Sequence, residues 1–285
     1  MNMNSTLSIV IPTCNRPESL DVCLRSVREA LSHAGCQDIE VVVTDDSPTE
    51  DSQRLVQVRH PQVRWSAGPR RGPASNRNAG VRAATGSWIL FVDDDCIVTR
   101  DWVLAYLRAF QRFPDACVFE GKTVADRPRR RMDEESPVNE HGGYLWSCNM
   151  AIRRDLFEDL GGFCESFPYA TMEDVDLRLR IEAGGHRFPF IAEAVVCHPY
   201  RASKGLHFVV KNGRSYLHLV DRHPDLVARR PILSGILNAA RRAKALMLDA
   251  VHCRFKGFPF AAGSLFIIVY YDFVARLRSH GSSAS

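Results

Sequence analysis

The sequence has no CxxC pair among its nine cysteines. The cysteines are scattered along the chain, and most of them lie inside apolar runs. Disulfide frameworks and structural zinc sites need cysteines at short, regular spacings, so the sequence argues against both. We therefore expect reduced, mostly buried thiols, as in a cytosolic protein.

The N-terminal residues also lack the features of a secretory signal peptide. No basic stretch precedes the first apolar run, Leu7 to Ile11, which is only five residues long. Secretory signals combine a basic start with a longer apolar segment. We expect no signal peptide here and a cytoplasmic location.

Negative charge is scarce in the last third of the chain. Residues 200–285 contain 14 Lys and Arg against 4 Asp and Glu, although the net charge of the whole chain is only +4. A basic segment of this kind favours an anionic partner, such as a membrane surface, nucleic acid or the acidic part of the same chain. No recognised nucleic-acid-binding motif accompanies it, so we expect no nucleic-acid partner.

Strand and helix patterns alternate through the first half of the chain. Short apolar runs that predict buried strands occur at residues 7–11, 39–45, 63–65 and 88–92, and segments with helical spacing separate them. Continuous apolar strands that alternate with helices predict an α/β, Rossmann-like fold with a mainly parallel sheet flanked by helices. A later strand ends in His198.

Polar side chains follow three of these strands at the point where each strand ends. Thr13 and Asn15 follow the first, Asp45 and Asp46 end the second, and Asp93 to Asp95 follow the fourth. Ligands of open α/β sheets bind beyond the carboxyl ends of the strands. The sequence therefore predicts one site assembled from separate segments of the chain.

The three adjacent carboxylates Asp93, Asp94 and Asp95 repel one another unless a cation or another partner lies beside them. Mg²⁺ and Mn²⁺ favour oxygen ligands and commonly bind substrate phosphates as well. Asp93 and Asp95 point to the same side of an extended chain, so one could reach a ribose and the other a metal. The alternative is a solvated turn that caps the following helix.

Five further residues are candidates for chemistry. Arg77 and Asn78 lie in the first turns of a predicted helix, where they could meet an anion or simply face solvent. Glu173 and Asp174 begin another helix, where a carboxylate could act as a general base or compensate the helix dipole. His198 could bind a metal or phosphate, or be structural.

Five segments occur in an order that resembles family 2 glycosyltransferases. They are SIVIPTCNRPESL, VVVTDDS, ASNRNAGVRAATGSWILFVDDDC, NMAIRRDLFEDLGGF and EDVDLRLR. Members of this family are inverting enzymes with the GT-A, or nucleotide-diphospho-sugar transferase, fold. The resemblance covers residues 6 to 200. It implies a nucleotide-diphospho-sugar donor carrying UDP, GDP or dTDP, a hydroxyl acceptor, and Mg²⁺ or Mn²⁺.

The resemblance also implies roles for individual residues. Asp174 matches the catalytic base, with Glu173 as its neighbour. The expected nucleotide-sugar site consists of Pro12, Thr13, Asn15, Arg16, Asp45, Asp46, Arg77, Asn78, Asp93 and Asp94. The expected metal ligands are Asp95, Asp93 and His198. The residues expected at the acceptor or the donor sugar are Trp146, Cys148 and Asn149.

The expected function is metal-dependent, inverting sugar transfer to a hydroxyl group in polysaccharide, glycolipid or glycoside biosynthesis. One alternative is a phosphatase of the haloacid-dehalogenase kind, because the strand before Asp93 resembles the DxD element of those enzymes. Another is a non-catalytic scaffold that binds sugar nucleotides.

The charged segment 126–141 and the apolar stretch near the C-terminus fall outside this pattern. Residues 126–141 are charged and contain proline, which predicts a mobile surface loop, either a lid or an insertion without a role. We place the catalytic domain at residues 1–200 and a basic, mainly helical extension at 201–285.

Near the C-terminus the apolar stretch GFPFAAGSLFIIVYYDFVARLR is flanked by Arg254, Lys256, Arg276 and Arg278. Its uninterrupted part is short for a membrane span. It therefore predicts either a segment lying on an anionic membrane, at the inner face of the cell membrane, or a helix packed on the catalytic domain.

Overall fold

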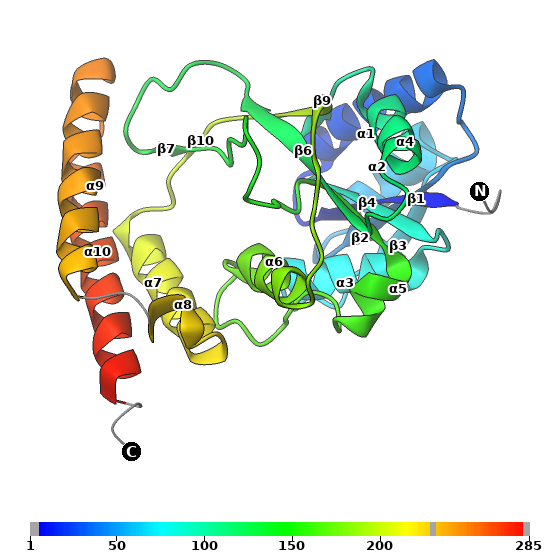
Figure 1. Cartoon of the computed structure of the whole chain (residues 1–285). Helices are drawn as coiled ribbons and strands as arrows, with labels where there is room; N and C mark the ends of the chain where they lie inside the picture. The colour runs from blue at the N-terminus through cyan, green and yellow to red at the C-terminus, as the bar shows by residue number, and fades with distance from the viewer. Residues whose placement is uncertain (1–5, 229–231, 282–285) are drawn as a thin grey trace. The chain divides into compact units, whose positions relative to one another are not determined.

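The structure is a computed structural model that describes residues 6–228 and 232–281 (Figure 1). It contains two compact units. The first, here the sheet unit, comprises the chain up to Asp126 together with Pro137–Glu165 and Glu173–Pro199. The second, here the helical unit, comprises Arg127–Ser136, Ser166–Met172 and the chain from Tyr200 onward.

The first part of the sheet unit alternates strands and helices: β1 (Leu7–Thr13), α1 (Pro17–Ala34), β2 (Glu40–Asp45), α2 (Asp51–Arg59), β3 (Arg64–Ala67), α3 (Pro73–Ala83) and β4 (Trp88–Val92). The rest contains β5 (Ile97–Val98), α4 (Trp102–Arg112), β6 (Val118–Ala125), β8 (Asn149–Arg153), α5 (Arg154–Asp159), α6 (Glu173–Ala183) and β9 (Phe190–His198).

The eight strands of this unit form one sheet in the order β3-β2-β1-β4-β8-β6-β9-β5. Strands β3, β2, β1 and β4 are parallel neighbours, and β6 and β9 are also parallel. Strand β8 is antiparallel to both β4 and β6, and β5 is antiparallel to β9. The predicted mainly parallel α/β sheet is confirmed. The sequence did not predict β6 and β8, because polar residues interrupt the apolar run in β6.

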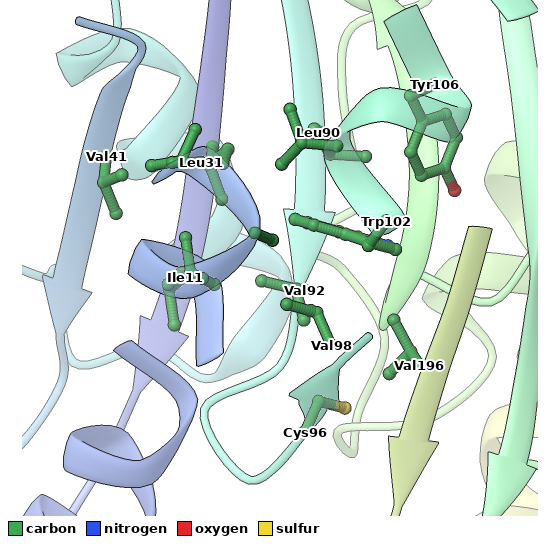
Figure 2. Close-up of a cluster of buried hydrophobic side chains, with 14 of the residues drawn as sticks. Ile11, Leu31, Val41, Leu90, Val92, Cys96, Val98, Trp102, Tyr106 and Val196 are labelled. Atoms are coloured by element: carbon green, nitrogen blue, oxygen red, sulfur yellow. The ribbon is translucent and has the colours of Figure 1, made fainter. Parts of the chain in front are cut away.

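Both faces of the sheet are buried. On one face, Ile11 and Leu90 pack with Trp102 and other residues of α1 and α4, in the cluster that Figure 2 shows. On the other face, Val10 and Phe91 pack against residues of α3, α5 and α6. Successive residues of a strand point to opposite faces, so a strand buried on both sides must be apolar throughout. This explains the continuous apolar runs of β1 and β4.

The helical unit consists of β7 (Glu134–Glu135), β10 (Arg201–Ala202), α7 (Leu206–Arg222), α8 (Asp225–Ala228), α9 (Ile232–His252) and α10 (Phe258–Gly281). Strands β7 and β10 pair antiparallel. Leu217 and Val220 of α7 pack against Ala275 of α10, which forms a small apolar core.

Most of residues 126–141 is irregular, as expected, but the segment is anchored. Met132 is buried in a cluster with Ala250 and Cys253, and Arg127 forms an ion pair with Glu134. These residues all belong to the helical unit. The prediction of a loose surface loop is therefore wrong for the part around Met132, whose apolar side chain fixes it to α9.

Helix α10 is longer than the uninterrupted apolar core of its sequence indicates. Within the described residues, Phe258–Arg278 is a helix long and apolar enough to cross a membrane, by length and composition only. Pro259 lies in its first turn, where proline is tolerated. Arg276, expected in a basic flank, is instead 2% exposed and bonded to Asp272 at 2.9 Å and to Ser234 at 3.1 Å.

Candidate active site

The carboxyl ends of β1 and β2 are tied to each other and to α3. The Asp46 N–H donates to the Thr13 carbonyl oxygen at 2.9 Å. The Asn76 side-chain amide donates to the carbonyl oxygens of Thr13 and Thr44 at 3.1 and 3.0 Å. Gly80 of α3 lies so close to β1 that a Cβ there would come within 2.4 Å of Val10. This packing fixes the edge of the sheet where the polar residues collect.

The three carboxylates after β4 contact four side chains. The Thr13 hydroxyl donates to Asp94 at 2.7 Å, and Arg16 donates to Asp94 at 3.0 Å. Arg77 donates to Asp93 at 2.7 Å, and the His198 imidazole lies 3.5 Å from Asp95. The expected convergence of strand ends is thus present, and the partners offset the repulsion between the adjacent charges.

The candidate metal ligands separate into two groups. Among the described residues, donor atoms of Asp95, Cys96 and His198 lie within 4.8 Å of one another. Asp93, also expected as a ligand, is not part of this group and instead binds Arg77. Burial raises the pKa of the Cys96 thiol well above its usual range, so it is a poor ligand for a hard cation.

Asp95 and His198 fit a divalent cation. Their facing atoms lie 3.5 Å apart, close enough for one ion with bonds of about 2.1 Å to contact both. Nδ1 of His198 lies 3.0 Å from the Pro199 carbonyl oxygen, which can only accept a hydrogen bond. In a neutral imidazole this places the lone pair of Nε2 toward Asp95, the orientation usual for metal-binding histidines.

Arg77 connects the carboxylates after β4 to those at the start of α6. Its guanidinium donates to Asp93 at 2.7 Å and lies 3.4 Å from Glu173. Burial opposes the charged form, but Asp93, Asp174 and Glu173 together raise the pKa of Arg77 above its ordinary value. Arg77 was expected at the nucleotide, and in this structure it bridges the two acidic groups.

Asp174 has the surroundings of a general base. Its Oδ2 accepts hydrogen bonds from the Ser147 N–H at 3.2 Å and the Ser147 hydroxyl at 3.1 Å. Its Oδ1 is buried and has no hydrogen-bond partner among the described residues. Burial is the main cause that raises the pKa of Asp174, and the charge of Asp93 adds to it. One oxygen is thus held in place while the other is left for a proton.

Glu173, beside the candidate base, is almost fully buried. Burial and the charge of Asp174 raise the pKa of Glu173 from 4.5 to about 7, although Arg77 acts in the opposite direction.

Because the folded-state pKa lies above the unfolded value, the contribution of Glu173 to the free energy of unfolding is fully present below pH 4.5 and lost as the pH rises through about 7. The loss amounts to about 3 kcal/mol at most. We expect Glu173→Gln to gain stability relative to the parent between these pH values. Urea unfolding of both proteins in EDTA at several pH values measures this. The control is Glu182→Gln, at an exposed position of the same helix; parallel curves for parent and Glu173→Gln would contradict the assignment.

The residues expected at the nucleotide base lie at the end of β2. Asp45 accepts hydrogen bonds from the Ser47 N–H at 2.8 Å and from the Trp65 indole at 3.3 Å. Asp46 accepts from the N–H groups of Arg70 and Gly72 at 2.9 and 3.2 Å. Partial burial and the charge of Asp45 raise the pKa of Asp46. Asp46 therefore also shapes the loop that follows β3, and Asp45 contacts the turn after β2 and β3 itself.

Three other residues that were expected to bind the nucleotide sugar make contacts within the protein. Pro12 is buried within β1. The Asn15 backbone has φ 56°, and its N–H donates to the Ser47 hydroxyl at 2.7 Å. The Asn78 side chain donates to the Phe163 carbonyl oxygen at 2.8 Å and so ties α3 to the chain after α5.

The three residues expected at the acceptor differ in exposure. Trp146 is partly buried and stacks on Tyr144, with ring centroids 5.3 Å apart. Cys148 is 3% exposed and lies in the apolar core. Asn149 is 1% exposed, and its side-chain Oδ1 accepts from the Trp102 indole N–H at 2.8 Å and from the Tyr106 hydroxyl at 2.9 Å. Cys148 and Asn149 thus join the start of β8 to the core, whereas Trp146 is only partly buried.

The contact between Ser147 and Asp174 could not be predicted from the sequence. The two residues are 27 positions apart, and a single serine before a strand is not a motif. The signal becomes visible only when the loop and the start of α6 are placed in space.

The sheet order, the acidic residues beyond the strand ends and the helices on both faces define a protein of the GT-A, or nucleotide-diphospho-sugar transferase, fold. The family model described as Glycosyl transferase family 2 matches residues 8–161, more than half of the chain. The chain belongs to this family, and the expected resemblance is confirmed.

A curated relative is the pre-mycofactocin glycosyltransferase of Mycobacterium tuberculosis, 27% identical over 260 residues. The match covers 82% of this chain and 51% of the relative, so the chain spans about half the length of that protein. Two solved structures share the fold. S. aureus TarS in complex with UDP-GlcNAc has a TM-score of 0.59 and 19% identity, covering 75% of this chain and 65% of TarS. The mannosyltransferase PcManGT from Pyrobaculum calidifontis, with GDP-Man and Mn²⁺, has a TM-score of 0.59 and 20% identity, covering 98% and 88%.

Proposed function

We propose that this chain transfers a sugar from a nucleotide-diphosphate donor to an acceptor hydroxyl, with inversion at the anomeric carbon. The observation that carries the proposal is the bridge made by Arg77. It joins Asp93, in the acidic group after β4, to Glu173, the neighbour of the candidate base. The donor-binding edge and the base thus belong to one connected site. Membership of the glycosyltransferase family supports this function over the phosphatase alternative.

The proposed metal ligands are Asp95 and His198, with Mg²⁺ or Mn²⁺ as the ion. A divalent ion held there would neutralise charge on the diphosphate as the sugar leaves. The Mn²⁺ bound in the PcManGT complex supports this choice of ion. Asp94, held by Thr13 and Arg16, shapes the same edge from β1.

The proposed base is Asp174. Its Oδ1 takes the proton from the acceptor hydroxyl while that oxygen attacks the anomeric carbon from the face opposite the leaving group. The new glycosidic bond forms as the bond to the diphosphate oxygen breaks, and the electron pair leaves with the nucleoside diphosphate. Ser147 keeps Oδ2 occupied, so only one oxygen is presented to the acceptor.

We propose that the nucleotide base lies beside Asp45 and Asp46. UDP-GlcNAc in TarS and GDP-Man in PcManGT support UDP, GDP or dTDP sugars as donors. The name of the M. tuberculosis relative supports sugar transfer, and we propose an acceptor in polysaccharide, glycolipid or glycoside biosynthesis. The direct test is turnover of nucleotide sugars with Mn²⁺. Release of nucleoside diphosphate supports transfer, and absence of both donor binding and hydrolysis would favour a scaffold.

We also propose that the protein works in the cytoplasm and that its helical unit lies on an anionic membrane. Four exposed side chains of α10, Phe266, Tyr270, Phe273 and Leu277, recur at the spacing of one helical stripe. Tyr216 and Arg276 contact Asp272, away from this stripe. A spanning α10 would take that charged pair into hydrocarbon, so a helix lying in the interface is favoured. Lys244 and its neighbours Arg241 and Arg242 add exposed positive charge on α9.

We expect the full chain to cosediment with vesicles containing anionic phosphatidylglycerol and to be released by high salt. Phe266→Asp should weaken binding by roughly tenfold, because it removes the contact of one aromatic side chain with the bilayer. The control is Val58→Asp, which changes an equally exposed apolar side chain on α2. If the protein does not sediment with anionic vesicles, the proposed membrane-binding surface is refuted. Release by detergent alone would show that α10 spans the membrane.

A further inference from the structure

We propose that Glu120, a buried carboxylate of β6, is a positioning residue for the acceptor. It holds residues 139–147, here the acceptor loop, in the conformation that brings Trp146 and Ser147 to Asp174. This inference rests on the proposed function, because it assigns the loop to the acceptor side of the same site.

Glu120 is 1% exposed and is bound by N–H groups of the acceptor loop. Its Oε2 accepts from the Gly143 N–H at 2.6 Å, and its Oε1 accepts from the Tyr144 N–H at 2.7 Å. The Leu145 N–H donates to the same Oε1 at close range, and the Asn139 side-chain amide donates to it at 2.7 Å. Three consecutive backbone N–H groups thus surround one carboxylate, an arrangement that stabilises negative charge.

The acceptor loop would not adopt its conformation readily without such a partner. Gly142 and Gly143 have φ of 83° and 96°, and Leu145 has φ of 52°. A bulky non-glycine residue in the left-handed region is costly and persists only where its surroundings hold it. The N–H groups that bind Glu120 belong to the same residues or their neighbours. Asn139 adds a second anchor, because its Oδ1 accepts from the Gly142 N–H at 2.8 Å.

The acceptor loop carries the groups that would meet an acceptor. Tyr144 is 51% exposed and stacks on Trp146, whose indole N–H has no hydrogen-bond partner among the described residues. Ser147, the next residue, binds the candidate base Asp174. The exposed Tyr144 ring suits the apolar face of a sugar, whereas the indole N–H of Trp146 is itself buried. Glu120 therefore acts on acceptor binding through the loop.

Two variants and one control test the inference. Glu120→Gln keeps the shape of the side chain but places an amide against N–H donors. Asn139→Ala removes the second anchor and is the milder change. The control is Glu40→Gln, since Glu40 also accepts a backbone N–H, from Thr85 at 2.7 Å, but lies at the start of β2.

The first measurement is hydrogen exchange of the peptide that covers the acceptor loop. Glu120→Gln should speed exchange of the amides of Gly143, Tyr144 and Leu145 by about tenfold or more, and Asn139→Ala should have a smaller effect. Glu40→Gln should leave them unchanged. Unchanged exchange in Glu120→Gln would overturn the inference.

The second measurement separates positioning from general damage. Donor binding is followed with UDP-glucose and GDP-mannose in Mn²⁺, and transfer with p-nitrophenyl glycosides as acceptors. Glu120→Gln should raise the acceptor KM by roughly tenfold while the donor Kd stays within about twofold. Equal losses in both would show a merely structural role. If the parent protein transfers nothing, the proposed function fails, whereas the exchange data still decide whether Glu120 holds the loop.

Discussion

Replacing Asp174 by Asn is expected to lower the rate of sugar transfer by roughly 10³-fold or more, the upper part of the range for a lost general base. The amide cannot take the proton of the acceptor hydroxyl. It remains the same size, and Ser147 can still contact it. The donor Kd should therefore stay within about twofold. The measurement is kcat for transfer together with donor affinity from calorimetry.

A helix-dipole role for Asp174 makes a different prediction. Asp51 begins α2 as an exposed acidic residue in the first turn, so Asp51→Asn is a matched control. If Asp174 only compensates the dipole of α6, both variants should lose a few tenths of a kcal/mol of stability and keep their activity. Near-normal transfer by Asp174→Asn would refute its assignment as the base.

Replacing Asp95 by Ala is expected to weaken Mn²⁺-dependent donor binding by about 100-fold or more, because loss of a residue that only orients a metal ligand already costs about 10- to 100-fold. Asp95 and His198 are the two residues whose geometry fits the ion, and the alanine variant removes the carboxylate. Calorimetric titration of nucleotide sugars with and without Mn²⁺ measures the change.

The surface pair of Asp101 and His33 provides the control for Asp95. Its imidazole lies 3.0 Å from the carboxylate, but Asp101 is exposed and lies outside the site. Asp101→Ala should therefore leave the effect of Mn²⁺ unchanged. If Asp95→Ala binds donor as tightly as the parent in excess Mn²⁺, Asp95 has no role in metal binding.

The edge of the sheet could be predicted from the sequence because its signals are local. Apolar runs followed at once by Thr13, Asp45 and Asp93 reveal both the strands and the side chains at their ends. Parallel strands then bring these ends together, as the structure confirms for β1, β2 and β4.

The partners of those residues could not be predicted in the same way. Arg77 was expected to meet an anion, but its anions are Asp93 and Glu173, one of them 96 positions away. Glu120 lies in a strand whose mixed polarity hides it, and its donors come from a glycine-containing loop. Such contacts depend on the order of strands in the sheet, which the sequence alone does not fix.

Residues that look equivalent in the sequence also differ in how deeply they are buried. Trp146 and Asn149 lie three positions apart, but Asn149 begins β8, and its side chain forms hydrogen bonds within the core. In the helical unit, Arg276 looks like its basic neighbours in the sequence. In the structure it is buried, and it donates hydrogen bonds to Asp272 and Ser234. Which side of a helix or strand is covered depends on neighbours distant in sequence.

Proton NMR of the anomeric centre during turnover tests the proposed reaction most directly. The purified chain is incubated with Mn²⁺, a nucleotide sugar that it binds and a hydroxyl acceptor, and the coupling constant of the anomeric proton is followed from donor to first product. Single displacement assisted by Asp174 predicts that the product has the anomeric configuration opposite to that of the donor, with release of nucleoside diphosphate. A product that retains the donor configuration, or release of inorganic phosphate without transfer of a sugar, would contradict it.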